Sequence, residues 1–259
     1  MGVLNVTSDS FSDGGAHLDP QRAIAAGLAM AEAGADIIDV GGESTRPQSQ
    51  PTDPAEERAR VVPVIRALAD AGVTISVDTR HAATMRAALD AGARIVNDVS
   101  ALSHDPAAAP LAAVRGCPVV LMHMRGVPAT MMRFASYTNV AAEVAAELAQ
   151  GIEAARQAGI GHEQIAIDPG IGFAKQAAHN VELLRRLPEL ASLGYPIVVG
   201  VSRKAFIGRL TGVSEPRDRL AGSLAAGLFA VARGASFLRV HNVSETVQAL
   251  HVWHALAAD

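Results

Sequence analysis

PQRAIAAGLAMAEAGADIIDVG, residues 20–41, contains two kinds of periodicity in one short stretch. From Pro20 to Gly34 the apolar residues recur at the three- and four-residue spacing of an amphipathic helix. Gly34 stands where helices commonly end, and DIIDVG (36–41) is a short apolar run typical of a buried strand. The stretch therefore predicts a helix that is followed almost at once by a strand.

The same alternation runs along the whole chain, with Ala-rich helical segments between short β-rich runs. The expected strands are GVLNV (2–6), DIIDVG (36–41), TISVDT (74–79), RIVNDV (94–99), PVVLMHM (118–124), QIAIDP (164–169), PIVVGVS (196–202) and FLRVHN (237–242). Strict alternation implies a parallel sheet. Eight units in 259 residues indicate an α/β fold, a single closed (β/α)8 TIM barrel, rather than an open Rossmann sheet, whose GxGxxG motif is absent. No linker or charge block divides the chain, so residues 1–259 are expected to form one domain.

The composition excludes several classes of partner. The chain is 49% hydrophobic, has a net charge of −4 and lacks a basic run, which gives no case for nucleic acid or an anionic membrane surface. No apolar stretch approaches the roughly 18 residues that a membrane span requires. Cys117 is the only cysteine and cannot form an internal disulfide, so a reducing cytoplasm is the expected location.

Polar side chains gather at the carboxyl ends of the expected strands, which is where the active sites of such barrels lie. A single Asp or Asn at a strand end often does no more than cap the next helix. Because seven strands carry such side chains at the same mouth, helix caps alone are an insufficient explanation. The residues at these ends are Asn5, Asp78, Asn97, Met122, His123, Asp168, Ser202, Arg203, Lys204, Arg239 and His241.

The chemistry of these side chains suggests a ligand with two different ends. Lys204, Arg239 and His241 follow strands 7 and 8, where barrels commonly bind phosphate. Alternatively, Arg239 and His241 pair with strand-end carboxylates. An Asp that faces the interior can accept two N–H bonds from an amidine-like edge, and Asn97 can both donate and accept. The set is suited to a flat, nitrogen-rich heterocycle that carries a phosphate group.

Nine motifs then resemble, in order and spacing, those of the dihydropteroate synthase family, the folate-pathway enzymes that sulfonamides inhibit. The motifs are MGVLNVTSDSFSDGG, GADIIDVGGESTRP, ISVDTR, ARIVNDVSA, VLMHMRGVPATM, DPGIGF, VGVSRKAFIG, RLAGSLAA and LRVHNVSET. The resemblance covers essentially the whole chain. It implies that dihydropterin pyrophosphate loses its pyrophosphate, and that the amine of p-aminobenzoate takes its place on the pterin methylene. It also implies a homodimer that associates through outer helices.

The resemblance assigns roles by matching position. The pterin would be held by Asp78, Asn97, Asp168 and Lys204, with Met122 on its ring and Gly200 leaving room. The pyrophosphate would be held by Asn5, Arg239 and His241, with Asn5 acting through Mg2+, and Thr45 and Arg46 would close over it. The walls around p-aminobenzoate would be Phe11, Pro47, Phe173 and Lys204.

The segment after the first strand, rich in Gly, Ser and Asp, is expected to fold over the mouth once substrate binds and to exclude water. In the resemblance, Asp9 and Asp13 would stabilise the pterin-methyl cation or the metal, and Mg2+ would stabilise the departing pyrophosphate. The residues expected to take part in the chemistry itself are Asn5, Asp9, Asp13, Lys204 and Arg239. The chain departs from the usual family pattern at Ser8, Gln48 and Ala205.

Other interpretations are weaker. His251 and His254 could bind a metal on the last helix, but without a third ligand nearby they are expected to be surface residues. Lys175 could touch a substrate phosphate, although a solvated loop lysine is the preferred interpretation. A non-catalytic pterin-binding paralogue would lack DSFSDGG, STRP and SRK, which this chain retains. A barrel that transfers methyl groups from methyltetrahydrofolate to a corrinoid protein needs no residues that grip pyrophosphate.

Overall fold

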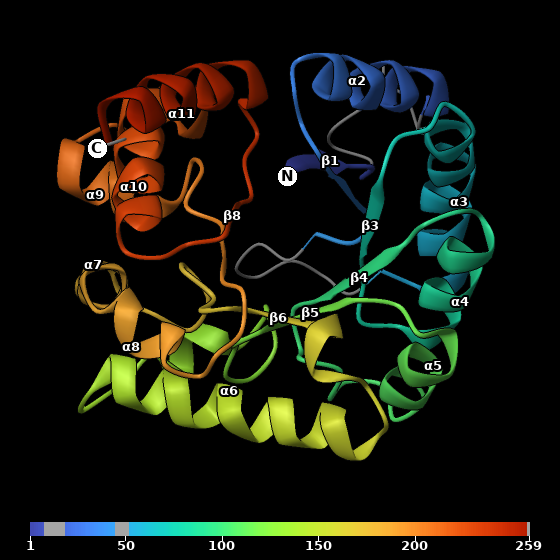
Figure 1. The fold of residues 1–259 in the computed structure, drawn as a ribbon, viewed down its shortest axis with the longest axis horizontal. Helices are drawn as coiled ribbons and strands as arrows, with labels where there is room; N and C mark the ends of the chain where they lie inside the picture. Colours follow the sequence, from blue (N-terminus) through green and yellow to red (C-terminus); the bar gives the residue numbers. More distant parts are fainter. Residues whose placement is uncertain (8–18, 45–51, 258–259) are drawn as a thin grey trace.

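Strands and helices alternate along the chain, and the helices surround the strands (Figure 1). The computed structural model describes residues 1–7, 19–44 and 52–257. The strands are β1 (Gly2–Asn5), β2 (Ile38–Gly41), β3 (Ile75–Asp78), β4 (Ile95–Asp98), β5 (Val119–Met122), β6 (Ile165–Asp168), β7 (Val198–Val199) and β8 (Phe237–Leu238). The α-helices are α2 (Pro20–Glu32), α3 (Pro54–Asp70), α4 (Ala82–Asp90), α5 (Ala108–Arg115), α6 (Val140–Gln157), α7 (Ala177–Arg185), α8 (Leu187–Ala191), α9 (Ala205–Thr211), α10 (Leu220–Ala232) and α11 (Val243–Ala257).

The eight parallel strands close into a ring. β1 to β6 pair in sequence order, and β7 pairs with β8. Two single bridges join these sheets: Ile167 pairs with Ile197, and Gly2 pairs with Val240. The Val3 N–H donates to the Val240 carbonyl at 2.9 Å, which ties the last strand to the first. The predicted (β/α)8 barrel is therefore confirmed, although β7 and β8 are only two residues long and thus shorter than the predicted runs 196–202 and 237–242.

Residues 20–41 fold into the helix and strand that their pattern predicts. The Asp19 carboxylate caps α2 by accepting a hydrogen bond from the Gln21 N–H at 2.9 Å, and Pro20 occupies the first helical turn. Gly34 follows the helix with a φ of +96°, a left-handed conformation that glycine adopts without strain. Gly27 lets α2 approach α3 closely, because a Cβ at this position would lie 2.7 Å from Leu68 Cδ1.

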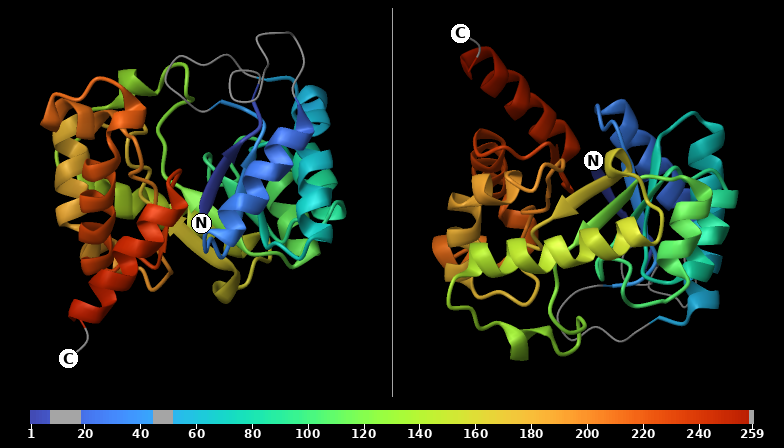
Figure 2. Two further views of the ribbon diagram at one scale, coloured as in Figure 1. Left: turned by 90° about the horizontal axis from the view of Figure 1, so that it is seen from above. Right: turned by 60° about the horizontal axis from the view of Figure 1, so that its bottom comes forward.

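The apolar core fills the space between the strands and the surrounding helices, whereas the inside of the ring contains polar groups. Asp39, Ser76 and Asn97 are buried on β2, β3 and β4. Figure 2 shows the helices packed around the outside of the strands, with α11 extending beyond them. No helix within the described residues is long and apolar enough to cross a membrane.

Candidate active site

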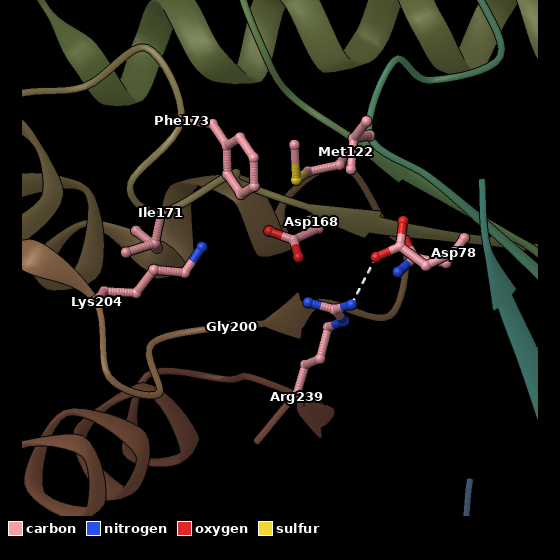
Figure 3. Close-up of a pocket in the computed structure, with 10 residues that line it drawn as sticks. Asp78, Met122, Asp168, Ile171, Phe173, Gly200, Lys204 and Arg239 are labelled. Atoms are coloured by element: carbon pink, nitrogen blue, oxygen red, sulfur yellow. Dashed lines mark hydrogen bonds and ion pairs between the residues drawn. The ribbon is translucent and has the colours of Figure 1, made fainter. Parts of the chain in front are cut away.

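A pocket of about 330 Å³ lies inside the ring at the carboxyl ends of the strands (Figure 3). Six strands, β3 to β8, supply its lining, either directly or through the segments that follow them. The lining residues are Asp78, Asn97, Val99, Met122, Asp168, Ile171, Phe173, Gly200, Lys204 and Arg239. All of these except Val99 and Ile171 were predicted as site residues from the sequence. The structure thus brings together residues that lie up to 161 positions apart in the chain.

Asp168 and Lys204 bring opposite charges to one side of this pocket (Figure 3). Burial raises the pKa of Asp168, and the Gly170 N–H, which donates to Asp168 Oδ1 at 2.7 Å, opposes that shift. Burial lowers the pKa of Lys204 to about 8, and the Asp168 carboxylate opposes this change. The second oxygen of Asp168 can accept N–H groups from a ligand in the pocket.

Arg239 is held between two carboxylates inside the ring. Its Nε donates to Asp39 Oδ2 at 2.6 Å, and its Nη2 donates to Asp78 Oδ2 at 2.6 Å. Burial lowers the pKa of Arg239, but Asp39 and Asp78 outweigh this effect and raise it above its usual value. The alternative interpretation of Arg239, a partner of strand-end carboxylates, is therefore confirmed, and two of its five N–H donors are used in doing so.

Asp39 is a residue of this site that the sequence analysis missed. It is fully buried on β2, and besides Arg239 it contacts Asn97, whose Nδ2 donates to Asp39 Oδ2 at 3.0 Å. One sequence signal was present, namely a charged residue inside the otherwise apolar run DIIDVG. Asp39 therefore fixes the side chains of Arg239 and Asn97 from below the pocket.

Asp78 ends β3, and the pKa of its carboxyl group is strongly raised. Burial raises its pKa to about 7, and the Arg239 guanidinium opposes the shift while Asp39 adds to it. Asp78 Oδ2 accepts from Arg239. Its other oxygen can accept a ligand N–H when the carboxyl group is ionised.

The wall of the pocket that Met122 and Phe173 form is apolar. Met122 and Phe173 lie side by side in Figure 3, and both pack in a small cluster with Val99, Met131 and Ala174. Lys204 Nζ lies 4.3 Å from the centre of the Phe173 ring, within the range of a cation–π contact. A flat ring can thus pack against Met122 and Phe173 while its edge meets Asp168.

Asn5 ends β1 and His241 follows β8, and neither residue lines this pocket. The His241 ring contacts Ser202 Oγ through Nδ1 at 3.1 Å. Asn5 is half-buried, and within the described residues its side chain has no hydrogen-bond partner. Its amide oxygen is a hard oxygen donor of the kind that Mg2+ accepts, so the residue fits the expected role at a metal.

Six predicted site residues lie outside the described residues. They are Asp9, Phe11 and Asp13 in the first loop and Thr45, Arg46 and Pro47 in the second.

Comparisons with known proteins agree with this geometry. Residues 1–241 match the family model of the pterin binding enzymes. The dihydropteroate synthase of Mycobacterium leprae is 50% identical over 258 residues, covering 97% of this chain and 91% of that protein. The structure of the Xanthomonas albilineans dihydropteroate synthase with 4-aminobenzoic acid has a TM-score of 0.94 at 50% identity, covering 100% of this chain and 93% of the other.

A second structure of the Xanthomonas enzyme, in complex with 7,8-dihydropteroate, has a TM-score of 0.91 at 48% identity, with the same coverage of both chains. The Yersinia pestis dihydropteroate synthase in a sulfonamide drug complex has a TM-score of 0.94 at 43% identity, covering 100% of this chain and 94% of that one.

The chain belongs to the dihydropteroate synthase family. It is a transferase of folate synthesis, as its relatives are. This family assignment is consistent with the position of the predicted residues, which meet at the carboxyl ends of the strands.

The sequence predicts that Lys175 is a solvated loop lysine, and that prediction is wrong. Its side chain is buried beneath the segment that joins β6 to α7, with 3% of the residue exposed. Its Nζ contacts His123 Nδ1 at 2.8 Å and the carbonyl oxygens of Gly170 and Phe173. The sequence could not reveal this burial, because it depends on contact with His123, which lies 52 positions away in the chain.

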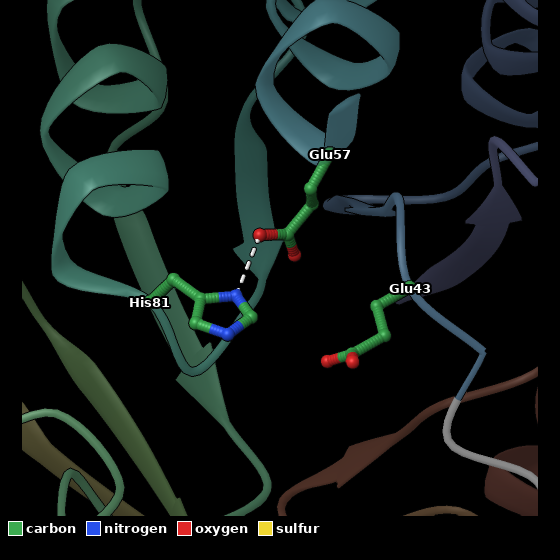
Figure 4. A group of neighbouring side chains, drawn as sticks. All are labelled: Glu43, Glu57 and His81. Carbon is green, nitrogen blue, oxygen red and sulfur yellow. Dashed lines mark hydrogen bonds and ion pairs between the residues drawn. The ribbon is translucent and has the colours of Figure 1, made fainter. Parts of the chain in front are cut away.

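Three neighbouring side chains outside the pocket could hold a metal ion. Glu43 follows β2, Glu57 comes from α3, and His81 precedes α4 (Figure 4). Their possible ligand atoms lie within 4.8 Å of one another. However, the Arg80 guanidinium already donates two hydrogen bonds to the Glu43 carboxylate, at 3.0 and 2.9 Å. The position beside Glu43 is therefore already occupied by a positively charged side chain.

Proposed function

We propose that residues 1–259 form a single pterin-binding barrel domain that condenses dihydropterin pyrophosphate with p-aminobenzoate and releases pyrophosphate. The observation that carries this proposal is the meeting of Asp78, Asn97, Asp168 and Lys204 in one pocket beside Met122 and Phe173. These side chains provide hydrogen-bonding groups for the edge of a nitrogen-rich ring and an apolar surface for its face.

The pterin binds with its amide and amine edge toward the carboxylates. Asp168 accepts ring N–H groups, Asn97 both donates and accepts, and Asp78 accepts with the oxygen that Arg239 leaves open. Met122 packs on the ring. Gly200 leaves space for the ligand, because the nearest protein atom to an added Cβ would be Arg239 Cβ at 3.8 Å.

The pyrophosphate group lies toward Asn5, Arg239 and His241. Arg239 keeps N–H donors that Asp39 and Asp78 do not use, and these can bind phosphate oxygens. We assign Mg2+ to Asn5, because an amide oxygen is a ligand that this ion would accept. When bound, the ion stabilises charge on the departing pyrophosphate. Thr45 and Arg46 remain predictions of the sequence for the same group.

The p-aminobenzoate ring lies against Phe173 and Lys204, with Phe11 and Pro47 as predicted walls. The bond between the pterin methylene and the pyrophosphate oxygen breaks, the amine nitrogen of p-aminobenzoate forms the new bond to that carbon, and the amine releases one proton. Exclusion of water protects the cationic methylene from hydrolysis. Asp9 and Asp13, as predicted from the sequence, stabilise its positive charge.

We further propose a homodimer, inhibition by sulfonamides and a cytoplasmic location. Apolar side chains exposed on α9, α10 and α11 support the dimer: Leu210, Phe229, Val252 and Leu256. A sulfonamide that resembles p-aminobenzoate would compete for the site beside Phe173. The buried, unpaired thiol of Cys117 suits a reducing compartment.

One assay tests the central proposal. Purified protein is incubated with Mg2+ and dihydropterin pyrophosphate, and pyrophosphate release is followed with and without p-aminobenzoate. We expect release to depend on p-aminobenzoate and dihydropteroate to form in equal amount. Release that is independent of p-aminobenzoate, or no release at all, would contradict the proposed reaction.

A further inference from the structure

Lys175 lies in a buried site that matches the bonding capacity of its ammonium group. An ammonium has three N–H donors and no acceptor. Three acceptors surround Lys175 Nζ: His123 Nδ1 at 2.8 Å, the Phe173 carbonyl at 3.0 Å and the Gly170 carbonyl at 3.1 Å. Burial lowers the pKa of Lys175 to about 7, and these acceptors favour the protonated form.

His123 extends this arrangement to helix α6. Its Nε2 lies 2.9 Å from Glu147 Oε2, and Glu147 also accepts from the Arg125 guanidinium at 3.0 Å. Burial, with the positive charge of Lys175, lowers the pKa of His123 to about 4, so the ring is neutral. Nδ1 therefore accepts from Lys175 and Nε2–H donates to Glu147, which fixes one tautomer. Lys175, His123, Glu147 and Arg125 form one continuous set of contacts.

The segment that precedes Lys175 contains three residues with positive φ, of which Ala174 is strained. Gly170 and Gly172 have φ values of +66° and +85°, and Ala174 has a φ of +48° although it carries a Cβ. A Cβ at Gly170 would lie 1.9 Å from the His123 carbonyl oxygen, so the segment runs directly against the one that follows β5. A conformation of this kind persists only where surrounding contacts enforce it.

The same segment supplies a wall of the pocket. Phe173 packs with Met122 and contacts Lys204, so its position sets the space between the apolar wall and the strand-7 side of the pocket (Figure 3). Lys175 itself does not line the pocket. Its effect on a ligand must therefore pass through the residues whose carbonyls it holds.

We propose that Lys175 is a positioning residue: by holding the Gly170 and Phe173 carbonyls against His123, it places the Phe173 ring where p-aminobenzoate binds. This inference rests on the proposed function and adds to it a residue outside the pocket. It separates the two lysines of the chain by task, because Lys204 meets the ligand and Lys175 shapes the wall that the ligand meets.

The test is the substitution Lys175→Met, which keeps an unbranched apolar stem as far as Cε and removes the three donors of the ammonium group. We expect the KM for p-aminobenzoate to rise by about tenfold or more, because small displacements in a site have effects of this size. The KM for dihydropterin pyrophosphate should change much less. Lys175→Gln keeps two N–H donors, so its KM for p-aminobenzoate should lie between those of Lys175→Met and the original protein. If Lys175→Met does not fold, Lys175→Gln replaces it in the test.

A double-substitution cycle tests the route through Phe173. If Lys175 acts by placing that ring, Lys175→Met should add little to the KM increase that Phe173→Ala causes alone. Thr84→Val is the control for lost stability, since Thr84 lies on α4 and makes its buried hydrogen bond outside the pocket. The control should leave both KM values unchanged at a temperature where all variants are folded.

Three results would overturn the inference: a lower melting temperature with an unchanged KM for p-aminobenzoate, equal increases in both KM values, or additive effects of the two substitutions. Failure of the proposed function has a different signature. In that case the unsubstituted protein itself would show no release of pyrophosphate that depends on p-aminobenzoate.

Discussion

Arg239 illustrates how one residue of this barrel can serve both the fold and, in the proposed function, the ligand. Its guanidinium donates hydrogen bonds to Asp39 and Asp78 inside the ring, and it keeps three further N–H donors at the lining of the pocket. A buried cation of this kind is stable only while its carboxylate partners remain, because an unpaired buried charge is costly. A structural role and a ligand-binding role are therefore compatible in Arg239.

Gly200 offers a test of the pocket volume. Gly200→Ala should leave the free energy of unfolding nearly unchanged, because no protein atom lies closer than 3.8 Å to the added Cβ. A pterin that fills this space would meet the methyl group, and calorimetry should find its affinity reduced by about tenfold or more. Equal affinity in the two proteins would place the ligand elsewhere.

Asp78 should make pterin binding depend on pH. Because burial raises its pKa to about 7, the group is largely protonated below neutral pH, and its oxygens accept ligand N–H bonds more strongly once it is ionised. Pterin affinity should therefore rise as the pH increases through 7, by about tenfold between pH 6 and pH 8. Titration calorimetry at several pH values measures this change, using a pterin whose ring does not titrate in that range.

The matching control for the pH measurement is Asp78→Asn. This variant should bind more weakly and lose most of the pH dependence, because its side chain does not titrate. If the pH dependence persisted in Asp78→Asn, another group would be responsible for it.

At the scale of elements, buried polar links hold neighbouring helices of the ring in place. Glu57, on α3, is fully buried and accepts hydrogen bonds from Thr84 Oγ1 on α4 at 2.7 Å and from His81 Nδ1 at 3.0 Å. Its other oxygen, Oε1, has no partner within the described residues. The carboxylate therefore depends on these two donors.

Thr84→Val should lower the free energy of unfolding by about 1–3 kcal/mol, since it removes one of these donors while keeping the shape of the side chain. Denaturant titration measures the change, and an unaltered slope would show that the unfolded state is the same. Pterin affinity should stay constant. A variant as stable as the original protein would mean that the Thr84 bond contributes nothing.

At the scale of the whole molecule, the strands are paired in a closed ring, so the helices form the surface through which the protein can associate with another copy. α10 packs against both α9 and α11, and these three helices carry the exposed side chains of Leu210, Phe229, Val252 and Leu256. Apolar side chains gathered on adjacent helices are typical of a surface that meets another protein. A second copy of the chain is the partner that we propose.

Sedimentation should accordingly give twice the mass of one chain. Phe229→Asp places a charge at this surface and should shift the protein to the monomer at micromolar concentration, because a desolvated, unpaired charge is costly in an interface. Thermal unfolding of the monomer should remain cooperative. A variant that sediments as a dimer would exclude this face as the interface.

The sequence by itself determined the fold class and most of the pocket. Periodicities of a few residues indicate helices and strands, and their strict alternation leaves few topologies. Since parallel strands end at one mouth, Asp78, Asn97, Met122 and Asp168 could be placed together from their positions at strand ends. The ends of β7 and β8 were less well predicted, because apolar composition does not show where hydrogen-bond pairing stops.

Only the tertiary structure decided how the charges pair. Arg239 and Asp39 are 200 positions apart, and Lys175 and His123 are 52 apart, so no local pattern links them. A lysine in a glycine-rich loop is usually solvated, and its burial here follows from the packing of the β6–α7 segment against the segment after β5. Burial and partner charges arise from the closed ring as a whole, and they determine which side chains bind a ligand and which hold the site in place.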